Sequence, residues 1–200
     1  LSERKISKST ARMFELYTHN GSLCFPYLYE DKIVNVKYRT LDKQFRQEKN
    51  ALKTLYNIDN LKKYWEDTKK LSIIFVEGEI DVLSLYECGF TNVVSLPDGA
   101  PKEAKFNMED KRFSAFQQSE WIFDAEEVII ATDSDVAGQA LSLELIHRFG
   151  RDICKIVHFP KYQDKPPEPI KQIKDANECL VQFGKEKLIE CILNAEEFPI

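Results

Sequence analysis

Four short apolar runs in the later part of the chain predict the strands of a parallel sheet. They cover residues 73–76, 93–96, 128–131 and 153–159. The first run is β-branched and aromatic and contains no polar residue, which is typical of a strand buried on both faces. Helical spacing of apolar residues follows in residues 80–89 and again in residues 138–150, each time up to a glycine. Strands that alternate with helices indicate an α/β fold.

The beginning of the chain follows a different pattern. Ser7 can cap a short helix whose apolar positions continue to Tyr17, and Asn20-Gly21 is expected to end that helix. Residues 24–29 and 33–38 predict two strands joined by a polar turn. We therefore expect a small N-terminal module that is rich in β-structure.

The remaining segments are expected to connect or cover these elements. Residues 57–70 are polar and lysine-rich, and they predict a helix and a connection in which we place a domain boundary. Residues 102–127 are charged with spaced aromatic residues, which favours helical cover with rings packed in the core. The Pro-rich residues 161–173 predict a surface loop, and residues 188–193 predict a C-terminal helix with one apolar face.

Charge is distributed unevenly along the chain. Residues 1–70 contain 15 Lys and Arg against 9 Asp and Glu, whereas the remaining residues contain 13 against 24. A basic first part and an acidic second part favour a polyanion bound by one and metal ions bound by the other. Two ordinary solvated surfaces are the alternative, which charge alone leaves open.

Several classes of site are not indicated. The five cysteines are widely scattered without a Cys-x-x-Cys pair, so we expect reduced thiols and no zinc site in this fragment. No apolar run reaches the roughly 18 to 20 residues of a membrane span, and no membrane partner is expected. The Gly-x-x-x-x-Gly-Lys-Ser/Thr pattern of a P-loop is absent from the sequence.

Carboxylates follow two of the predicted strands. Glu77, Glu79 and Asp81 surround Gly78 after the first strand, and Asp133-Ser134-Asp135 follows the third. The carboxyl ends of parallel strands lie at one edge of a sheet, where α/β proteins bind ligands. Buried carboxylates cost several kcal/mol unless a cation, a proton or hydrogen bonds compensate.

This acidic edge favours a divalent metal site. Carboxylate oxygens suit Mg²⁺ or Mn²⁺, so Glu77, Asp81, Asp133 and Asp135 could hold such ions and leave one carboxylate as a proton acceptor. Phosphoryl transfer is the natural reaction of such a site. Either acidic turn alone could be explained without a metal ion, with Asp81 and Asp135 as residues at helix starts and Glu79 as a solvated charge. Asp175 could cap a final helix or face this acidic edge.

Residues 36–49 alternate cations with aromatic rings. Cations for phosphates and flat rings for bases are the chemistry of single-strand nucleic-acid binding. The pattern alone favours an ordinary amphipathic strand. The residues concerned are Lys37, Tyr38, Arg39, Lys43, Phe45, Arg46 and Lys49.

Several motifs together resemble a known family. They are Glu77-Gly78-x-x-Asp81, Asp133-x-Asp135-x-x-Gly138, residues 94–101 (VSLPDGAP) and residues 174–178 (KDANE). They resemble the TOPRIM domain, and specifically the primase core of T7-type primase-helicases and their organellar Twinkle-like relatives. The resemblance implies an α/β fold, α+β as a whole, with a TOPRIM Rossmann-like parallel sheet flanked by helices, a small N-terminal α+β basic subdomain and a C-terminal helical segment.

The resemblance also implies domain limits and residue roles. Residues 1–66 would be the basic subdomain that guides template and nucleotides, residues 67–182 the TOPRIM catalytic domain, and residues 183–200 a C-terminal helix and the start of a linker to a helicase domain. The implied roles are a catalytic acid/base for Glu77, which also belongs to the metal set; Mg²⁺ (or Mn²⁺) ligands for Asp81, Asp133, Asp135 and Asp175, with Glu79 assisting; DNA or nucleotide contacts for Lys37, Arg39, Lys43 and Arg46; and backbone requirements for Gly78 and Gly138.

The expected function is that of a DNA primase core, a nucleotidyltransferase that makes short RNA primers on a single-stranded DNA template for DNA replication. Its expected partners are the template, ribonucleoside triphosphates, a helicase domain in the same longer chain and a DNA polymerase that takes over the primer. A non-catalytic single-stranded-DNA-binding module of a Twinkle-type helicase and a TOPRIM nuclease are the alternatives. An organelle (mitochondrion, plastid or apicoplast) is the favoured location, with the cytoplasm of a phage-infected bacterium as the alternative.

Overall fold

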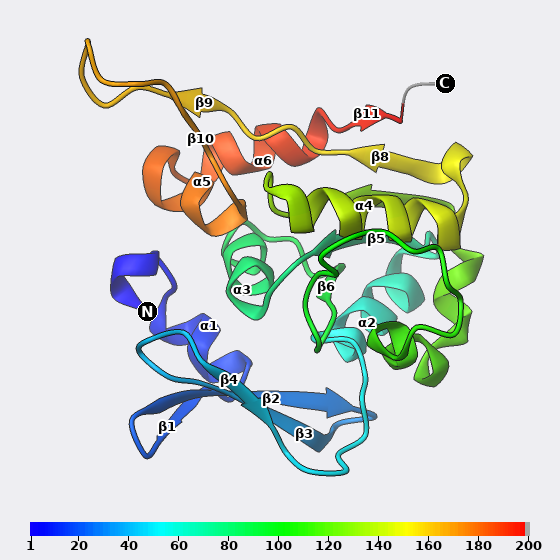
Figure 1. Ribbon diagram of the computed structural model, residues 1–200. Helices are drawn as coiled ribbons and strands as arrows, with labels where there is room; N and C mark the ends of the chain where they lie inside the picture. Colours follow the sequence, from blue (N-terminus) through cyan, green and yellow to red (C-terminus); the bar gives the residue numbers. More distant parts are fainter. Residues whose placement is uncertain (199–200) are drawn as a thin grey trace.

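The predicted parallel sheet is present in the computed structural model, which describes residues 1–198 (Figure 1). The sheet has the strand order β11-β8-β7-β5-β6, in which β5 to β8 are parallel and β11 runs antiparallel to β8. This arrangement confirms the predicted α/β fold. The strands are β5 (Ser72–Val76), β6 (Val93–Ser95), β7 (Glu127–Ile130), β8 (Cys154–Ile156) and β11 (Glu196–Glu197).

Helices cover both faces of this sheet, and β5 shows why its residues are all apolar. Ile74 and Val76 belong to one apolar core with α3 and the C-terminal helices, whereas Ile73 and Phe75 belong to a second core with α2 and α4. Each fully buried side chain of this size contributes roughly 1.5–3 kcal/mol. The helices are α2 (Ile58–Thr68), α3 (Glu79–Glu87), α4 (Val136–Phe149), α5 (Ala176–Phe183) and α6 (Lys185–Leu193).

The aromatic segment before β7 packs as predicted, but in a tighter helical form. Two 3₁₀ helices, η2 (Lys111–Gln118) and η3 (Glu120–Asp124), place Phe116 and Ile122 in the second core. Trp121 stacks on Trp65 of α2 with ring centroids 5.2 Å apart. Another 3₁₀ turn, η4 (Arg151–Ile153), joins α4 to β8.

The N-terminal module is a four-stranded antiparallel sheet in the order β1-β2-β3-β4. Ser7 caps the preceding α1 by accepting a hydrogen bond from the Thr10 backbone N–H at 3.1 Å. The sheet consists of β1 (Tyr17–His19), β2 (Ser22–Tyr29), β3 (Lys32–Arg39) and β4 (Phe45–Gln47), and η1 (Ser2–Arg4) and α1 (Lys8–Met13) precede it.

The predicted continuation of α1 to Tyr17 is wrong. The helix ends at Met13, Glu15 adopts a positive φ of 53°, and Tyr17 begins an edge strand paired with β2. Asn20-Gly21 therefore forms the hairpin between β1 and β2, with φ values of 47° and 73° that suit a type I′ turn. Strand pairing overrides the helical spacing here.

The two parts of the chain share a core. Phe25 and Tyr27 of the N-terminal sheet pack in the same cluster as Ile74 of β5, and Tyr56 forms a β-bridge with Ser95 of β6. The predicted boundary between residues 66 and 67 falls inside α2, which contacts both β2 and β6. The division into domains stays a prediction.

The end of the chain adds two small features. Residues 161–173, predicted as a loop, contain a two-stranded arm formed by β9 (Lys161–Tyr162) and β10 (Lys171–Gln172). β11 pairs with β8 where a linker was predicted to begin, and residues 199–200 of that predicted linker lie outside the described residues. No helix within residues 1–198 combines the length and apolar character needed to cross a membrane.

Candidate active site

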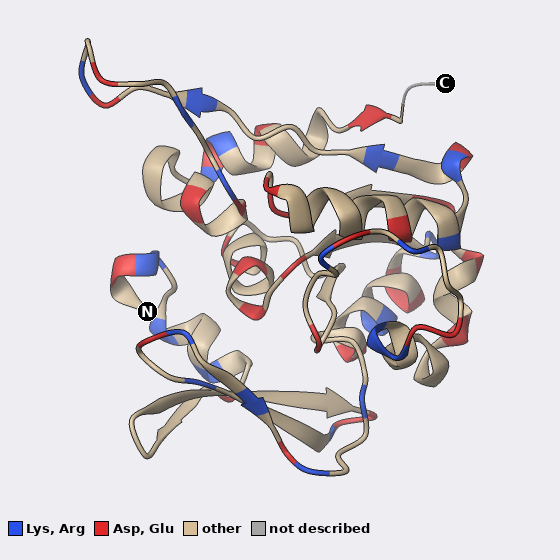
Figure 2. Ribbon diagram, in the orientation of Figure 1, with Lys and Arg blue, Asp and Glu red and all other residues tan. Residues whose placement is uncertain are grey.

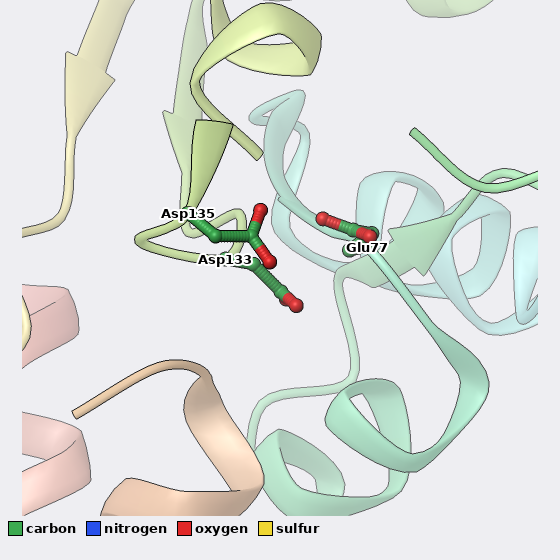
Figure 3. A group of neighbouring side chains, drawn as sticks. All are labelled: Glu77, Asp133 and Asp135. Atoms are coloured by element: carbon green, nitrogen blue, oxygen red, sulfur yellow. The ribbon is translucent and has the colours of Figure 1, made fainter. Parts of the chain in front are cut away.

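Glu77, Asp133 and Asp135 meet at the carboxyl edge of the central sheet (Figure 3). Each offers one carboxylate oxygen, and these oxygens all lie within 4.8 Å of one another. β5 and β7 are adjacent parallel strands, with Phe75 paired to Ile130, so the residues that follow them emerge side by side. The sheet topology therefore brings together the two acidic turns that lie more than 50 residues apart in the sequence.

Glu77 has a buried carboxylate oxygen, Oε2, without a hydrogen-bond partner in the described part of the chain. Burial raises the pKa of Glu77 to about 7, and the negative charges of Asp133 and Asp135 add to this effect. A carboxylate in this state can exchange a proton near neutral pH or accept a cation.

Lys174 compensates the charge of the two aspartates. Its Nζ atom lies 3.1 Å from Oδ2 of Asp133 and 3.1 Å from Oδ2 of Asp135. Burial raises the pKa of Asp133 to about 6, although the ion pair with Lys174 opposes this. Burial would also raise the pKa of Asp135, but the backbone hydrogen bond from Gly138 and the contact with Lys174 together lower it.

A side chain at Gly138 would clash with the backbone of the acidic turn before α4. A Cβ atom at this position would lie 1.9 Å from the carbonyl oxygen of Asp133, so any side chain would displace the loop that carries Asp133. The same residue donates its backbone N–H to Oδ1 of Asp135, the N-cap of α4, at 2.9 Å. The Asp-x-Asp-x-x-Gly spacing is thus the geometry of one tight strand-to-helix turn.

Gly78 has no comparable requirement. Its backbone is extended, with φ at −133°, and a Cβ would meet Oδ2 of Asp81 at 3.5 Å, an ordinary van der Waals distance. The structure therefore gives no support to the predicted backbone role of Gly78.

Glu79 points to the N-terminal sheet. Its Oε1 atom accepts hydrogen bonds from the Tyr27 hydroxyl and, at 2.8 Å, from Nζ of Lys37. Glu79 is 4% exposed and Lys37 is 7% exposed, so this is a buried ion pair. Neither its predicted metal role nor the predicted nucleic-acid role of Lys37 is tested by this contact, but both side chains are already engaged by the protein.

Asp81 and Asp175 lie beside the three-carboxylate group and bind helix ends. Oδ1 of Asp81 accepts the backbone N–H of Asn177 at 3.0 Å, and Asp175 caps α5 through the backbone N–H of Glu178 at 2.7 Å. Burial raises the pKa of Asp81, and the charges of Asp175 and Asp133 raise it further. Asp175 therefore does both things considered from the sequence, since it caps a helix and lines the cavity at the acidic edge.

A cavity of about 320 Å³ separates the acidic edge from the N-terminal sheet. It is lined by Glu77, Asp81, Asp133 and Asp175 from the acidic edge and by Arg39, Lys43 and Phe45 from the N-terminal module. Arg4 of η1, which packs against α5, also lines it. A second cavity of about 400 Å³ lies on the other side of the Glu77 turn and is lined by Lys37, Phe45 and Arg46 with the turn at residues 97–99. Figure 2 shows acidic residues at the starts of α3 and α4 and basic residues in the N-terminal sheet.

The four predicted basic residues are thus divided between two cavities. Arg39 and Lys43 face the carboxylates, and burial lowers the pKa of Arg39. Arg46 lies with its guanidinium 3.6 Å from the centre of the Tyr38 ring. Sequence reasoning missed Lys174 and Arg4 as members of the site.

The two missed residues differ in how visible they were. Lys174 belongs to the KDANE block and stands directly before Asp175, so that block could have indicated it. Arg4 has no sequence signal, because it reaches the cavity only through packing of η1 against α5, where its Nη1 donates to Oδ1 of Asn177 at 2.9 Å.

The carboxylate group fits a hard divalent cation. It offers only oxygen ligands, it contains a buried Glu77 oxygen without a partner, and it is open to a cavity. Mg²⁺ and Mn²⁺ both prefer such ligands and retain waters in their remaining positions. Glu77, Asp133 and Asp135 are the residues that would hold the ion.

Comparison with known proteins identifies the family to which the central sheet belongs. Residues 72–158 match the Toprim domain family. The chain contains a Toprim domain. The match begins with β5 and ends just after β8, so it includes both acidic turns and the parallel strands that position them. The predicted resemblance to this family is confirmed.

Two curated relatives from Arabidopsis thaliana cover most of the chain. A primase homolog protein is 40% identical over 184 residues, which are 89% of this chain and 51% of the relative. The chloroplastic/mitochondrial Twinkle homolog protein is 38% identical over 184 residues, again 89% of this chain but 24% of the relative. The chain therefore spans about half of one relative and about a quarter of the other.

Solved structures of the bacteriophage T7 primase-helicase share the fold. The primase fragment is 25% identical, covers 96% of this chain and 72% of its own, and superposes with a TM-score of 0.66. A structure of T7 DNA polymerase with primase domains bound to an RNA/DNA hybrid and dTTP is 25% identical, covers 99% of this chain and 92% of its own, and has a TM-score of 0.68. The similarity thus extends beyond the Toprim domain to the N-terminal sheet.

Proposed function

We propose that this chain is the catalytic core of a DNA primase, which synthesises short RNA primers on single-stranded DNA with Mg²⁺ or Mn²⁺. The observation that carries the proposal is the group of Glu77, Asp133 and Asp135, in which one carboxylate oxygen of each residue lies within 4.8 Å of the others. This group includes a buried Glu77 oxygen without a partner in the described part of the chain and borders a cavity that Arg39 and Lys43 also line. Carboxylates opposite cations are what phosphoryl transfer between nucleotides requires.

Each part of the site has a place in this reaction. The 3′ oxygen of the primer attacks the α-phosphorus of a ribonucleoside triphosphate, and the bond to the leaving pyrophosphate breaks. Glu77, with a pKa of about 7, accepts the proton of the 3′ hydroxyl. Asp133 and Asp135, together with Glu77, would hold the divalent ion, which when bound would neutralise charge on the phosphate oxygens.

The remaining residues orient the reactants in this proposal. Arg4, Arg39 and Lys43 line the same cavity as the carboxylates, and phosphates of the nucleotide or the template would lie against them. Lys174 keeps the two aspartates close together by pairing with both of them. Asp175 and Asp81 fix the start of α5 beside the cavity, and their predicted metal roles remain part of the proposal. Glu79 is instead given a joining role, because Tyr27 and Lys37 already bind it.

Partners and location follow from the relatives. The T7 primase domains bind an RNA/DNA hybrid and contact a DNA polymerase, which supports a DNA template and a polymerase that takes over the primer. The Twinkle homolog is chloroplastic/mitochondrial, which supports an organellar location, while the T7 similarity keeps a phage source open. We propose a helicase domain in the same longer chain on the basis of the primase-helicase similarity.

Primer synthesis tests the proposed function. Labelled ribonucleotides, single-stranded DNA and Mg²⁺ or Mn²⁺ should yield short RNA, and Glu77→Gln and Asp133→Asn should each reduce the yield by at least about 100-fold, since a positioned acid or base contributes that much. Glu190→Gln, in an exposed ion pair of α6, is the matched control and should keep full activity. Undiminished synthesis by folded Glu77→Gln protein would contradict the assignment.

The same assay separates the alternatives. The similarity to a Twinkle homolog favours a binding module as the second candidate, which would bind single-stranded DNA but make no primer with either metal. A Toprim nuclease would instead cleave labelled DNA in the presence of Mg²⁺ without any nucleotide.

A further inference from the structure

Phe45 presents an exposed aromatic ring in the wall shared by the two cavities beside Glu77. It begins β4, and 54% of its surface is exposed. Both cavities are lined by Phe45 together with Glu77, Gly78 and Glu79. The ring therefore lines the same two cavities as the turn that carries the proposed catalytic carboxylate.

Tyr38, the other ring in the basic segment of residues 36–49, is already in use. It is 9% exposed, and its hydroxyl donates a hydrogen bond to Glu48. The guanidinium of Arg46 covers its ring at 3.6 Å from the centroid. The structure thus divides two residues that look equivalent in the sequence, since Tyr38 packs within the sheet and Phe45 faces the cavities.

The cations around Phe45 suit a nucleotide. Nζ of Lys37 lies 5.2 Å and the guanidinium carbon of Arg39 lies 5.8 Å from the centre of the ring. Lys37 is held by Glu79, and Arg39 faces the carboxylates across the first cavity. A flat apolar ring beside cations and a metal-binding edge can take a nucleobase on the ring while the phosphates lie toward the cations.

We infer that Phe45 is a stacking platform for a nucleobase at the acidic edge. This inference rests on the proposed function for the identity of the nucleotide, and it adds a binding residue that contacts the base rather than the phosphates. The base belongs to an incoming ribonucleoside triphosphate or to the single-stranded template. Every nucleobase can stack on an aromatic ring, so Phe45 binds the nucleotide without discriminating among the bases.

A tryptophan at this position reports stacking directly. Phe45→Trp keeps an aromatic ring, and its fluorescence should fall saturably on titration with ATP and Mg²⁺, with single-stranded oligodeoxythymidylate, or with both. If only ATP quenches the fluorescence, the base on the platform is that of the incoming nucleotide. If only the oligonucleotide quenches it, the base belongs to the template. The wild-type chain supplies the background, because its two tryptophans, Trp65 and Trp121, are partly buried, stack on each other against the second core and line neither cavity.

Inorganic tripolyphosphate is the control ligand, since it carries the charge of a triphosphate without a base. It should leave the fluorescence of Phe45→Trp unchanged. Quenching by tripolyphosphate equal to that by ATP, or no quenching by either nucleotide ligand, would overturn the inference.

Affinity provides the second measurement. Phe45→Ala should weaken binding of the effective ligand by roughly five- to 150-fold, the range that base–aromatic stacking supplies. In primer synthesis the loss should fall on KM more than on kcat, and Phe45→Tyr should restore affinity whereas Phe45→Leu should not. Wild-type affinity in Phe45→Leu would refute an aromatic role.

Leu41 offers the matched control. It lies in the loop before β4, is 97% exposed, and lines neither cavity, so Leu41→Ala should bind as the wild type does. Base-dependent quenching in a protein that makes no primer would leave the platform intact and reject only the primase proposal. Primer synthesis without base-dependent quenching would support the primase proposal and reject the stacking role of Phe45.

Discussion

Two groups of carboxylates lie at the same edge of the sheet and differ in what their oxygens contact. Glu77 has a buried oxygen without a protein partner, and it lies close to Asp133 and Asp135. Glu79, two residues further on, is bound by Tyr27 and Lys37, and Asp81 binds the first turn of α5. The first group keeps the Glu77 oxygen free for a ligand while Lys174 pairs with its two aspartates, whereas the second group joins the Toprim domain to its neighbours.

The difference shows that acidic residues in one motif can serve opposite purposes. A carboxylate that binds a metal ion must have a free oxygen, and holding it beside other carboxylates destabilises the protein without the ion. A carboxylate with a buried lysine and a tyrosine hydroxyl already has its charge compensated. The second group can therefore fix the N-terminal sheet and α5 around the cavity in which the first group would act.

The largest expected effect tests the joining role of Glu79. Glu79→Gln leaves the buried ammonium of Lys37 without an opposite charge, and breaking such a pair costs about 3–5 kcal/mol. The free energy of unfolding, measured by urea denaturation, should fall by that amount. A smaller loss in the double variant Glu79→Gln/Lys37→Met would show that the unpaired charge is the cause.

An exposed ion pair provides the control for this measurement. Glu190→Gln removes the partner of Lys187 on the surface of α6 and should leave stability nearly unchanged, because exposed pairs contribute little. Equal losses in Glu79→Gln and Glu190→Gln would show that burial of the Glu79 pair does not matter.

The second prediction concerns metal affinity. Asp133→Asn removes a carboxylate from the group of Glu77, Asp133 and Asp135 and should weaken Mn²⁺ binding at least about tenfold. Even residues that only hydrogen-bond to metal ligands contribute that much to affinity. Glu79→Gln should change it less than about twofold. Electron paramagnetic resonance of free Mn²⁺ measures both, and comparable losses in the two variants would give Glu79 a metal role after all.

The third prediction concerns the pH dependence of stability. The pKa of Glu77 is about 7 in the folded protein, well above its ordinary value of 4.5. Between these values the folded state binds more protons than the unfolded state, so Glu77 makes the folded protein lose stability as pH rises from about 4.5 toward 7. Glu77→Gln should therefore match the wild type at pH 4.5 and exceed its Tm at pH 8, in a metal chelator.

Divalent metal supplies the check on this prediction. Added Mn²⁺ should raise the Tm of the wild type at pH 8 more than that of Glu77→Gln, because the ion compensates the charge that destabilises the folded state. A constant Tm difference between the two proteins from pH 4.5 to pH 8 would show that Glu77 ionises as an ordinary glutamate.

Local pattern determined the elements that depend on neighbouring residues. The unbroken apolar run of β5 predicts burial on both faces, and the sheet buries it so. The Asp135-to-Gly138 spacing predicts a helix start, because a carboxylate caps the N–H three residues later. The same reasoning failed after Met13, where pairing of β1 with β2, an interaction between separate segments, decides the conformation.

The sequence by itself determined the parallel sheet, its two acidic turns and the tight turn around Gly138. Only the tertiary structure decided which acids lie together, because strand order places β7 beside β5 and α5 against α3. It also separated Glu79 from Glu77, which are the same residue type with different neighbours, and Tyr38 from Phe45, two aromatic rings of which only Phe45 lines the cavities. A residue's type fixes what it can bind, and the fold fixes whether its binding capacity is already used.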